Sequence, residues 1–242
     1  MRRFTLQPDR LTAGHVTFDA SESRHLSRVL RLQPGDTVIA TDGAGRDYTV
    51  RLESVGDAAT GTVIAEAAGV PESPLTITLV QGVPKGDKME AIVRAATELG
   101  VVCVRPALCE RTVVRLEPSR WRDRARRWQR VAREAAKQSG RAIVPEVEMP
   151  RPLAECLGPK VDLALCLWEG GGEPLGSVLA AARAPASATV IVGPEGGLAR
   201  AEVDAARAVG VTVVSLGQRI LRTETAGPAI LAILQSRLGD LR

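Results

Sequence analysis

The sequence has few of the residues that build metal sites and redox centres. It contains only two histidines, His15 and His25, and its four cysteines form no CxxC pair. Zinc sites take four Cys or His ligands at recurring close spacings, so we expect no bound metal. The cysteines are expected to be buried and reduced, which is the usual state of free cysteine.

Long apolar segments are missing too. No run approaches the roughly 20 apolar residues of a membrane-spanning helix. Residues 1–10 lack the apolar core that is typical of a signal peptide. The chain is otherwise ordinary for a globular protein, with 45% hydrophobic and 25% charged residues. We therefore expect a cytoplasmic protein with no membrane partner.

Standard nucleotide-binding motifs are also absent. No GxGxxG follows a first strand and no GxxxxGK(S/T) is present, which excludes the usual dinucleotide and P-loop sites. Lysine supplies only four of the 32 basic residues, and genome composition alone can produce such a skew. The distribution of charge is more informative. Residues 1–72 hold 8 basic and 10 acidic side chains, and residues 73–242 hold 24 and 18. This mild positive excess permits a polyanionic partner but does not require one.

The chain divides at GVPESP, residues 69–74, a stretch typical of a linker. Before it, short strand-like runs alternate with turn signals such as QPGD and TDGAGRD, and one helical patch interrupts them at 21–32. The strand-like runs are HVTFDA, DTVIATD, DYTVRLESV and GTVIAEA. Many short strands within about 70 residues predict a small β-barrel over residues 1–72.

From Leu75 onward, apolar strand-like runs alternate with helical patterns. Helices are expected at 87–99, 119–139, 174–183, 200–209 and 226–238. Continuous Val, Ile and Leu runs between helices indicate a parallel sheet that is covered on both faces, so residues 73–242 are expected to form an α/β domain. At the first helix, Asp87 and Glu90 have the spacing of a capping box.

Three loops at strand ends carry unusual residues. They are LWEGGGEP at 167–174, GPEGGLAR at 193–200 and LGQRILRTETA at 216–226. Ligands of open α/β sheets bind beyond the carboxyl ends of the strands, where these loops are expected to meet. Glycines after strands are often only turn residues. A glycine pair before a helix, however, also lets a backbone approach a ligand closely.

The third loop places two arginines and a carboxylate at a strand-to-helix junction. Burial there must desolvate or pair Arg219, Arg222 and Glu224. One interpretation is purely structural: an Arg222–Glu224 ion pair, with Thr225 capping the helix and Pro228 in its first turn. The other is that these charges act on a ligand.

Two basic segments remain. In residues 120–141 one helical face is apolar and arginines crowd the other, which predicts either a solvated face or a contact with nucleic acid or another subunit. In the first part, Arg2 and Arg3 precede Phe4, and a second group lies at 24–31. These bases stand in a net negative background, so we expect them to contact phosphates.

The chain resembles the RsmE-type 16S rRNA uridine N3-methyltransferases of the SPOUT superfamily over essentially its whole length. The resemblance is carried by MRRF (1–4), RHLSRVLRLQPGD (24–36), PKGDKMEAIVRAATELG (84–100), CERTV (109–113), EAAKQSGR (134–141), GPEGGL (193–198) and LGQRILRTETA (216–226). The chain departs from the family pattern at Ala199, where a helix-capping Ser or Thr is common, and at Ala95, which is often Lys.

The resemblance implies a PUA-like RNA-binding barrel over 1–72 and a trefoil-knotted SPOUT methyltransferase domain over 73–242. It implies a homodimer that binds S-adenosylmethionine and methylates N3 of a uridine in 16S rRNA. The cofactor residues that it implies are Leu167, Trp168, Glu169, Val192, Gly193, Pro194, Glu195, Gly196, Gly197, Leu216, Gly217, Ile220, Leu221, Arg222, Thr225 and Ala226. The RNA-binding residues are Arg2, Arg3, Phe4, Arg24, His25, Arg28, Arg31, Lys85, Lys88 and Arg141.

The chemistry of the reaction assigns roles to the third loop. Uridine N3 must lose a proton before it attacks a methyl group, and an arginine stabilises the resulting anion. Arginine stays protonated, so Glu224 is the expected proton acceptor, and Arg219, Arg222 and Glu224 are the expected catalytic residues. Two alternatives stay open: methylation of another RNA position such as a ribose 2′-hydroxyl, and a non-catalytic RNA-binding assembly factor.

Overall fold

The computed structural model describes residues 2–158 and 160–241. The chain forms two compact units, residues 1–72 together with 133–144, and residues 73–132 together with 145–242. The segment 133–144, which the sequence analysis assigned to the second part, thus packs within the first unit. No helix in the described part of the chain is both long and apolar enough to cross a membrane.

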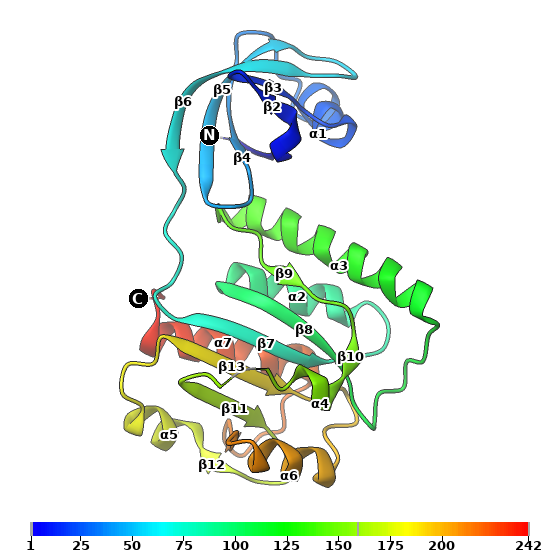
Figure 1. Cartoon of the computed structure of the whole chain (residues 1–242), viewed down its shortest axis with the longest axis vertical. Coiled ribbons are helices and arrows are strands. Elements are labelled where there is room, and N and C mark those ends of the chain that lie inside the picture. Colours follow the sequence, from blue (N-terminus) through cyan, green and yellow to red (C-terminus); the bar gives the residue numbers. More distant parts are fainter. Residues whose placement is uncertain (1, 159, 242) are drawn as a thin grey trace. The chain divides into compact units, whose positions relative to one another are not determined.

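The first unit contains a curled six-stranded sheet, which forms a half-barrel where the sequence predicts a small β-barrel (Figure 1). Its strands are β1 (Arg3–Thr5), β2 (Leu11–Thr12), β3 (His15–Thr17), β4 (Thr37–Thr41), β5 (Arg46–Ser54) and β6 (Thr60–Ala68). Their order is β1-β4-β5-β6-β3-β2, and only β1 and β4 run parallel. Alternate residues of β5 point inward, and Val50 and Leu52 join Phe4, Phe18 and Leu26 in the core.

A short helix and the distant segment 133–144 complete this unit. Helix α1 (Ala20–Arg24) is capped by Asp19, whose carboxylate accepts hydrogen bonds from two backbone N–H groups at 2.8 Å, and a π-helical turn (His25–Val29) follows it. Buried Glu22 accepts hydrogen bonds from the Thr5 N–H and from Lys137 Nζ, both at 3.0 Å. These contacts hold segment 133–144 against the half-barrel.

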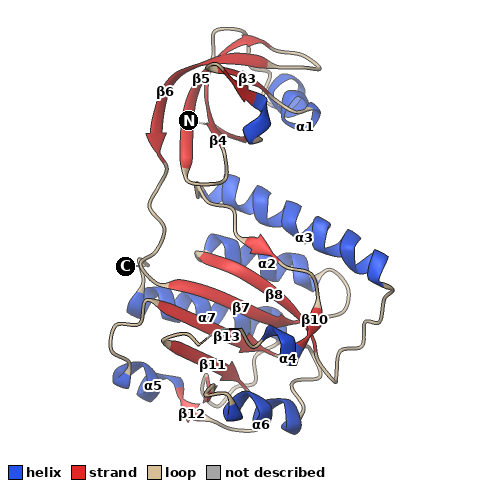
Figure 2. Cartoon of the chain, viewed as in Figure 1, coloured by secondary structure: helices blue, strands red, loops and turns tan. Residues whose placement is uncertain are grey.

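The second unit is built on a parallel sheet, as the sequence predicts (Figure 2). Its strands are β7 (Thr76–Gly82), β8 (Val101–Leu108), β9 (Glu146–Val147), β10 (Arg151–Pro152), β11 (Leu163–Leu167), β12 (Glu173–Pro174), β13 (Ser187–Val192) and β14 (Thr212–Ser215). The order is β10-β8-β7-β13-β11-β14-β12, with β9 beside β8.

Helices cover the two faces of this sheet. They are α2 (Lys88–Glu98), α3 (Pro118–Ser139), α4 (Leu153–Cys156), α5 (Leu175–Ala181), α6 (Arg200–Ala208) and α7 (Thr223–Leu238). Val80 and Ile191 of the central strands pack with Leu153 of α4 and Val203 of α6. Helices α2 and α7 pack against each other, and α7 also contacts β7 and β13.

Two expectations about helix ends are wrong. Asp87 makes no side-chain capping hydrogen bond at the start of α2, because the Glu90 N–H donates to the Asp87 carbonyl at 3.0 Å. The Glu90 carboxylate, the other half of the expected box, pairs with Arg127 of α3, whose Nε lies 2.6 Å away. Helix α7 begins at Thr223 and not at 226, so Thr225 lies inside the first turn and caps nothing. At the start of α6, Ala199 stands where a capping Ser or Thr is common. Glu202 offsets this loss, because its carboxylate accepts a hydrogen bond from the Ala199 N–H at 2.9 Å.

The cysteines are free thiols, as predicted, but only three of them are buried. Cys109, Cys156 and Cys166 lie in the core of the second unit, and Cys103 is partly exposed. Burial raises the pKa of Cys109 and of Cys166 to about 12, so both stay protonated at neutral pH and are poor nucleophiles.

Candidate active site

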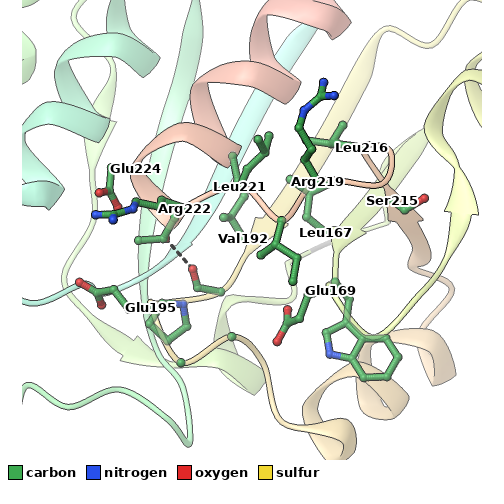
Figure 3. Close-up of a pocket in the computed structure, with 18 of the residues that line it drawn as sticks. Leu167, Glu169, Val192, Glu195, Ser215, Leu216, Arg219, Leu221, Arg222 and Glu224 are labelled. Carbon is green, nitrogen blue, oxygen red and sulfur yellow. Dashed lines mark hydrogen bonds between the residues drawn. The ribbon is translucent and has the colours of Figure 1, made fainter.

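A cavity of about 750 Å³ opens where the three unusual loops meet at the carboxyl ends of β11, β13 and β14. It is lined by Lys85, Lys88, Leu167, Trp168, Glu169, Gly171, Gly172, Val192, Gly193, Pro194, Glu195, Gly196, Gly197, Val214, Ser215, Leu216, Gly217, Gln218, Arg219, Ile220, Leu221, Arg222, Thr223, Glu224 and Ala226 (Figure 3). The parallel order of the strands brings these loops together from positions far apart in the sequence.

The structure gathers nearly all of the predicted site residues here. Every predicted cofactor residue except Thr225 lines the cavity, and so do the predicted catalytic residues Arg219, Arg222 and Glu224. Thr225 is exposed on α7 instead, because the helix begins three residues earlier than expected. Lys85 and Lys88, predicted as RNA contacts, also line the cavity.

The glycine loop 193–197 is packed tightly at its three glycines, Gly193, Gly196 and Gly197, which leave little room for a side chain. A Cβ on Gly193 would lie 3.0 Å from the Gly197 carbonyl carbon, and Gly197 has φ +69°. A Cβ on Gly197 would lie 2.0 Å from Oε1 of Glu169. Arg111, which precedes α3, holds the loop from outside by donating a hydrogen bond to the Gly196 carbonyl at 3.0 Å. At its glycine positions the loop therefore presents backbone to the cavity, beside the side chains of Pro194 and Glu195.

Thr223 ties this loop to the start of α7. Its hydroxyl donates to the Gly193 carbonyl at 2.6 Å and accepts from Gln81 Nε2 at 2.9 Å. Both side chains are buried, and Gln81 projects from the otherwise apolar strand β7. Sequence reasoning missed both residues, although a glutamine at the end of an apolar strand is a usable signal. Three distant segments are thus joined by one buried hydroxyl.

A lysine and two carboxylates form a charged cluster at the cavity wall. Lys88 Nζ lies 3.0 Å from Glu195 and 3.4 Å from Glu224. The hydrogen bond to Glu195 raises the pKa of Lys88, against a smaller opposing effect of desolvation. Burial would raise the pKa of Glu195, but hydrogen bonds from its own N–H, from Lys88 and from the Lys85 N–H lower it overall. The cluster is therefore charged at neutral pH at Lys88 and Glu195.

In the described part of the chain, the structure does not form the Arg222–Glu224 ion pair on which the purely structural interpretation of this junction depends. Glu224 pairs with Lys88, and no ion pair joins it to Arg222 among the described residues. Arg219 and Arg222 are both exposed. In Figure 3, Arg222 lies near Glu224 at the start of α7, and Arg219 lies apart from them. Glu224 Oε2 is buried without a hydrogen-bond partner. The predicted Arg222–Glu224 ion pair is wrong, and Arg222 remains available to a ligand.

The predicted RNA contacts of the first unit separate into two groups. Arg2, Arg24, Arg28 and Arg31 are exposed, and His25 is partly exposed. Phe4 is fully buried, with its ring centroid 5.8 Å from that of Phe18, so its side chain cannot reach RNA in this conformation. Arg3 is paired with Asp47 at 2.8 Å, and Arg141 is paired with Glu72. These two arginines hold the unit together.

Comparison with known proteins agrees with the fold. Residues 71–235 match the family model of an RNA methyltransferase domain, and residues 18–61 match that of an RNA methyltransferase PUA domain. The cavity at the strand ends thus lies in an RNA methyltransferase domain of the SPOUT type.

Relatives and solved structures specify the family. A ribosomal RNA small subunit methyltransferase E of Synechocystis is 35% identical over 98% of this chain and 78% of its own length. The Bacillus subtilis protein of that name is 32% identical over 88% of this chain and 87% of its own. A crystal structure of the Neisseria gonorrhoeae enzyme, bound to S-adenosylmethionine, superposes with a TM-score of 0.90 at 36% identity and covers 100% of both chains. The chain belongs to the ribosomal RNA small subunit methyltransferase E family.

Proposed function

We propose that this chain transfers the methyl group of S-adenosylmethionine to N3 of one uridine in 16S rRNA. The observation that carries the proposal is the shared cavity, in which the glycine-rich loop 193–197 faces the charged start of α7. Family membership supports rRNA methylation, and the chemistry of the cavity supports the particular acceptor.

The cavity fits the cofactor in size and in charge. Its volume of about 750 Å³ lies within the range of small-molecule sites. Three carboxylates line it: Glu195 and Glu224 face Lys88, whereas Glu169 has no ion-pair partner among the described residues and suits a ligand that carries a sulfonium and an amino group. We propose that the loops 167–172, 193–197 and 216–221 hold the cofactor, which supplies an electrophilic methyl group when bound.

The start of α7 is suited to the acceptor base. Arg222 has no ion-pair partner among the described residues, so its guanidinium is free to meet the negative charge that develops on the uracil oxygens. Glu224 lines the cavity, and its Oε2 is buried without a hydrogen-bond partner, 3.4 Å from Lys88 Nζ, so the carboxylate keeps capacity to accept a proton. We assign the N3 proton to Glu224, directly or through water, and anion stabilisation to Arg222. Arg219 lies apart and is assigned to positioning the RNA near the cavity mouth.

The RNA and the oligomer belong to the same proposal. The exposed arginines of the half-barrel, Arg2, Arg24, Arg28 and Arg31, are suited to phosphate contacts. A cytoplasmic homodimer and a trefoil knot are what the family resemblance implies. After β14 the chain crosses the sheet, since α7 packs on β7 and β13, and the knot itself rests on the resemblance.

Nucleoside analysis tests the proposal. Small-subunit rRNA from a strain without this protein should lack one N3-methyluridine, which a plasmid copy restores and an Arg222→Ala copy does not. Purified protein with labelled S-adenosylmethionine should methylate 16S rRNA from the deletion strain. A methylated ribose in place of the base, or full methylation in the deletion strain, would contradict the uridine assignment. Failure to bind S-adenosylmethionine in calorimetry would indicate a non-catalytic factor.

A further inference from the structure

The first half of helix α3 has an extreme charge imbalance. Between Pro118 and Arg130 it carries six arginines and one acidic residue, Asp123. Three of the arginines, Arg122, Arg126 and Arg130, follow one another at intervals of four residues, so they form a single row along the helix. All three are exposed. We call this row the arginine face.

Packing does not require the arginine face. Another side of α3 buries Trp121, Ala125 and Trp128, whose mean direction around the helix lies about a third of a turn from that of the three arginines. The two indole rings pack together with centroids 6.4 Å apart. The helix is therefore fixed to its unit by apolar contacts that neutral polar residues at the three exposed positions would leave intact.

The arginine face also costs helix stability. Like charges at i and i+4 repel, and both Arg122–Arg126 and Arg126–Arg130 are such pairs. The first turn of α3 has no acidic residue, so nearby positive charge opposes the helix dipole. A face with only a solvating role would gain stability from interspersed glutamates.

Acidic neighbours do little to neutralise this face. Arg126 lies 3.6 Å from Asp123, but both side chains are 76% exposed, so the pair is weak. Arg127 is held by Glu90 on a different side of the helix. Neither Arg122 nor Arg130 has an ion-pair partner among the described residues. Positive charge is therefore concentrated where a polyanion would relieve the repulsion.

We infer that the arginine face binds the phosphate backbone of the rRNA substrate, as a second contact surface apart from the half-barrel. This inference rests on the proposed function for the identity of the polyanion. Four residues of α-helix rise about 6 Å, which lets successive arginines reach successive phosphates along one strand. Because these contacts carry no base readout, they strengthen binding to RNA of any sequence.

The test compares two triple variants of the full-length protein. One variant is Arg122→Gln/Arg126→Gln/Arg130→Gln. The matched control, Arg51→Gln/Arg183→Gln/Arg237→Gln, removes the same charge from exposed positions elsewhere. Binding to a 16S rRNA transcript is measured by fluorescence anisotropy over a range of salt concentrations, together with methylation, melting temperature and sedimentation.

The arginine-face variant should bind the transcript at least about tenfold more weakly near 0.1 M salt. Its log–log salt slope should fall by about 2–3, since each phosphate that is no longer neutralised reduces the slope by about 0.7–0.9. Its melting temperature should stay level or rise, and the control should keep the wild-type slope. If the arginine-face variant keeps the wild-type salt slope while the wild-type enzyme methylates rRNA, this inference is overturned and the proposed function is not. A changed sedimentation coefficient with normal RNA binding would instead identify a protein–protein surface. A wild-type protein that binds the transcript but leaves it unmethylated would count against the proposed function and not against this surface.

Discussion

Replacing Thr223 by valine removes one hydroxyl from the centre of the active site while preserving its shape. The change leaves the Gly193 carbonyl without its 2.6 Å donor and Gln81 Nε2 without its 2.9 Å acceptor. Gln81 Nε2 keeps the Gly82 carbonyl at 3.0 Å and reaches the Gly193 carbonyl only at 3.5 Å, so the main loss still falls on Gly193. An unsatisfied buried polar group costs about 1–3 kcal/mol. In a chain of this size, that corresponds to a melting temperature lower by about 2–12 °C.

The same substitution should weaken cofactor binding, because Thr223 fixes the glycine loop that we assign to S-adenosylmethionine. Differential scanning fluorimetry measures the first effect and isothermal titration calorimetry the second. Thr225→Val is the matched control, since it makes the same chemical change two residues away on an exposed position outside the cavity. Surface changes of this kind stay within about 0.5 kcal/mol. Equal behaviour of the two variants would refute the assigned role of the buried hydroxyl.

Three further predictions concern the charged groups. Glu224→Gln should slow methyl transfer by about 10²–10⁴-fold and Arg222→Ala by about 10²–10³-fold, with little change in cofactor affinity. Only the Glu224→Gln rate should recover strongly as pH rises, because alkali supplies the N3 anion. If melting temperature and cofactor affinity fall in parallel with the rate, these charges serve the fold. Because the pKa of Glu195 is lowered in the folded state, its stabilisation is present above the unfolded pKa and is lost as pH falls through the folded pKa. Lys88→Met should therefore move the acid fall in melting temperature to higher pH, while Lys85→Met, which keeps its backbone N–H, should not; an unmoved Lys88→Met curve would contradict the ion pair. A variant that neutralises the exposed arginines of the half-barrel combines changes at Arg2, Arg24, Arg28 and Arg31. Its salt slope of rRNA binding should fall by about 0.7–0.9 for each phosphate that is no longer neutralised. An unchanged slope would place the RNA elsewhere.

Patterns that depend on neighbouring residues were predictable from the sequence. The apolar runs that became β7, β11, β13 and β14 alternate with helical patterns, and a parallel sheet brings the ends of such strands together. The glycine loop and the junction at 216–226 were therefore predictable as parts of one site. The family resemblance added the chemistry that periodicity cannot supply.

Patterns that depend on distant partners were not predictable. Nothing near Glu90 in the sequence indicates that Arg127 will take its carboxylate from the helix cap. Lys88 and Glu224 lie far apart in the chain, so their contact follows only from the packing of α2 against α7. The same packing extends α7 by one turn at its start, which turns Thr223 inward and Thr225 outward. One shifted boundary thus exchanged the roles of two threonines.

The discontinuity of the first unit affects how the protein is made. Residues 2–72 leave the ribosome early, yet the unit lacks segment 133–144 until 72 more residues have been added. At about 5–20 residues per second, the nascent half-barrel waits roughly 4–14 s for its last piece. During that interval Glu22 has no Lys137 to neutralise it, and the backbone around Gly45 lacks the Ala142 carbonyl, which it meets at 3.1 Å in the finished unit. The half-barrel therefore cannot finish folding as soon as its own strands are translated, although it is still complete before the second unit, which needs residues 145–242.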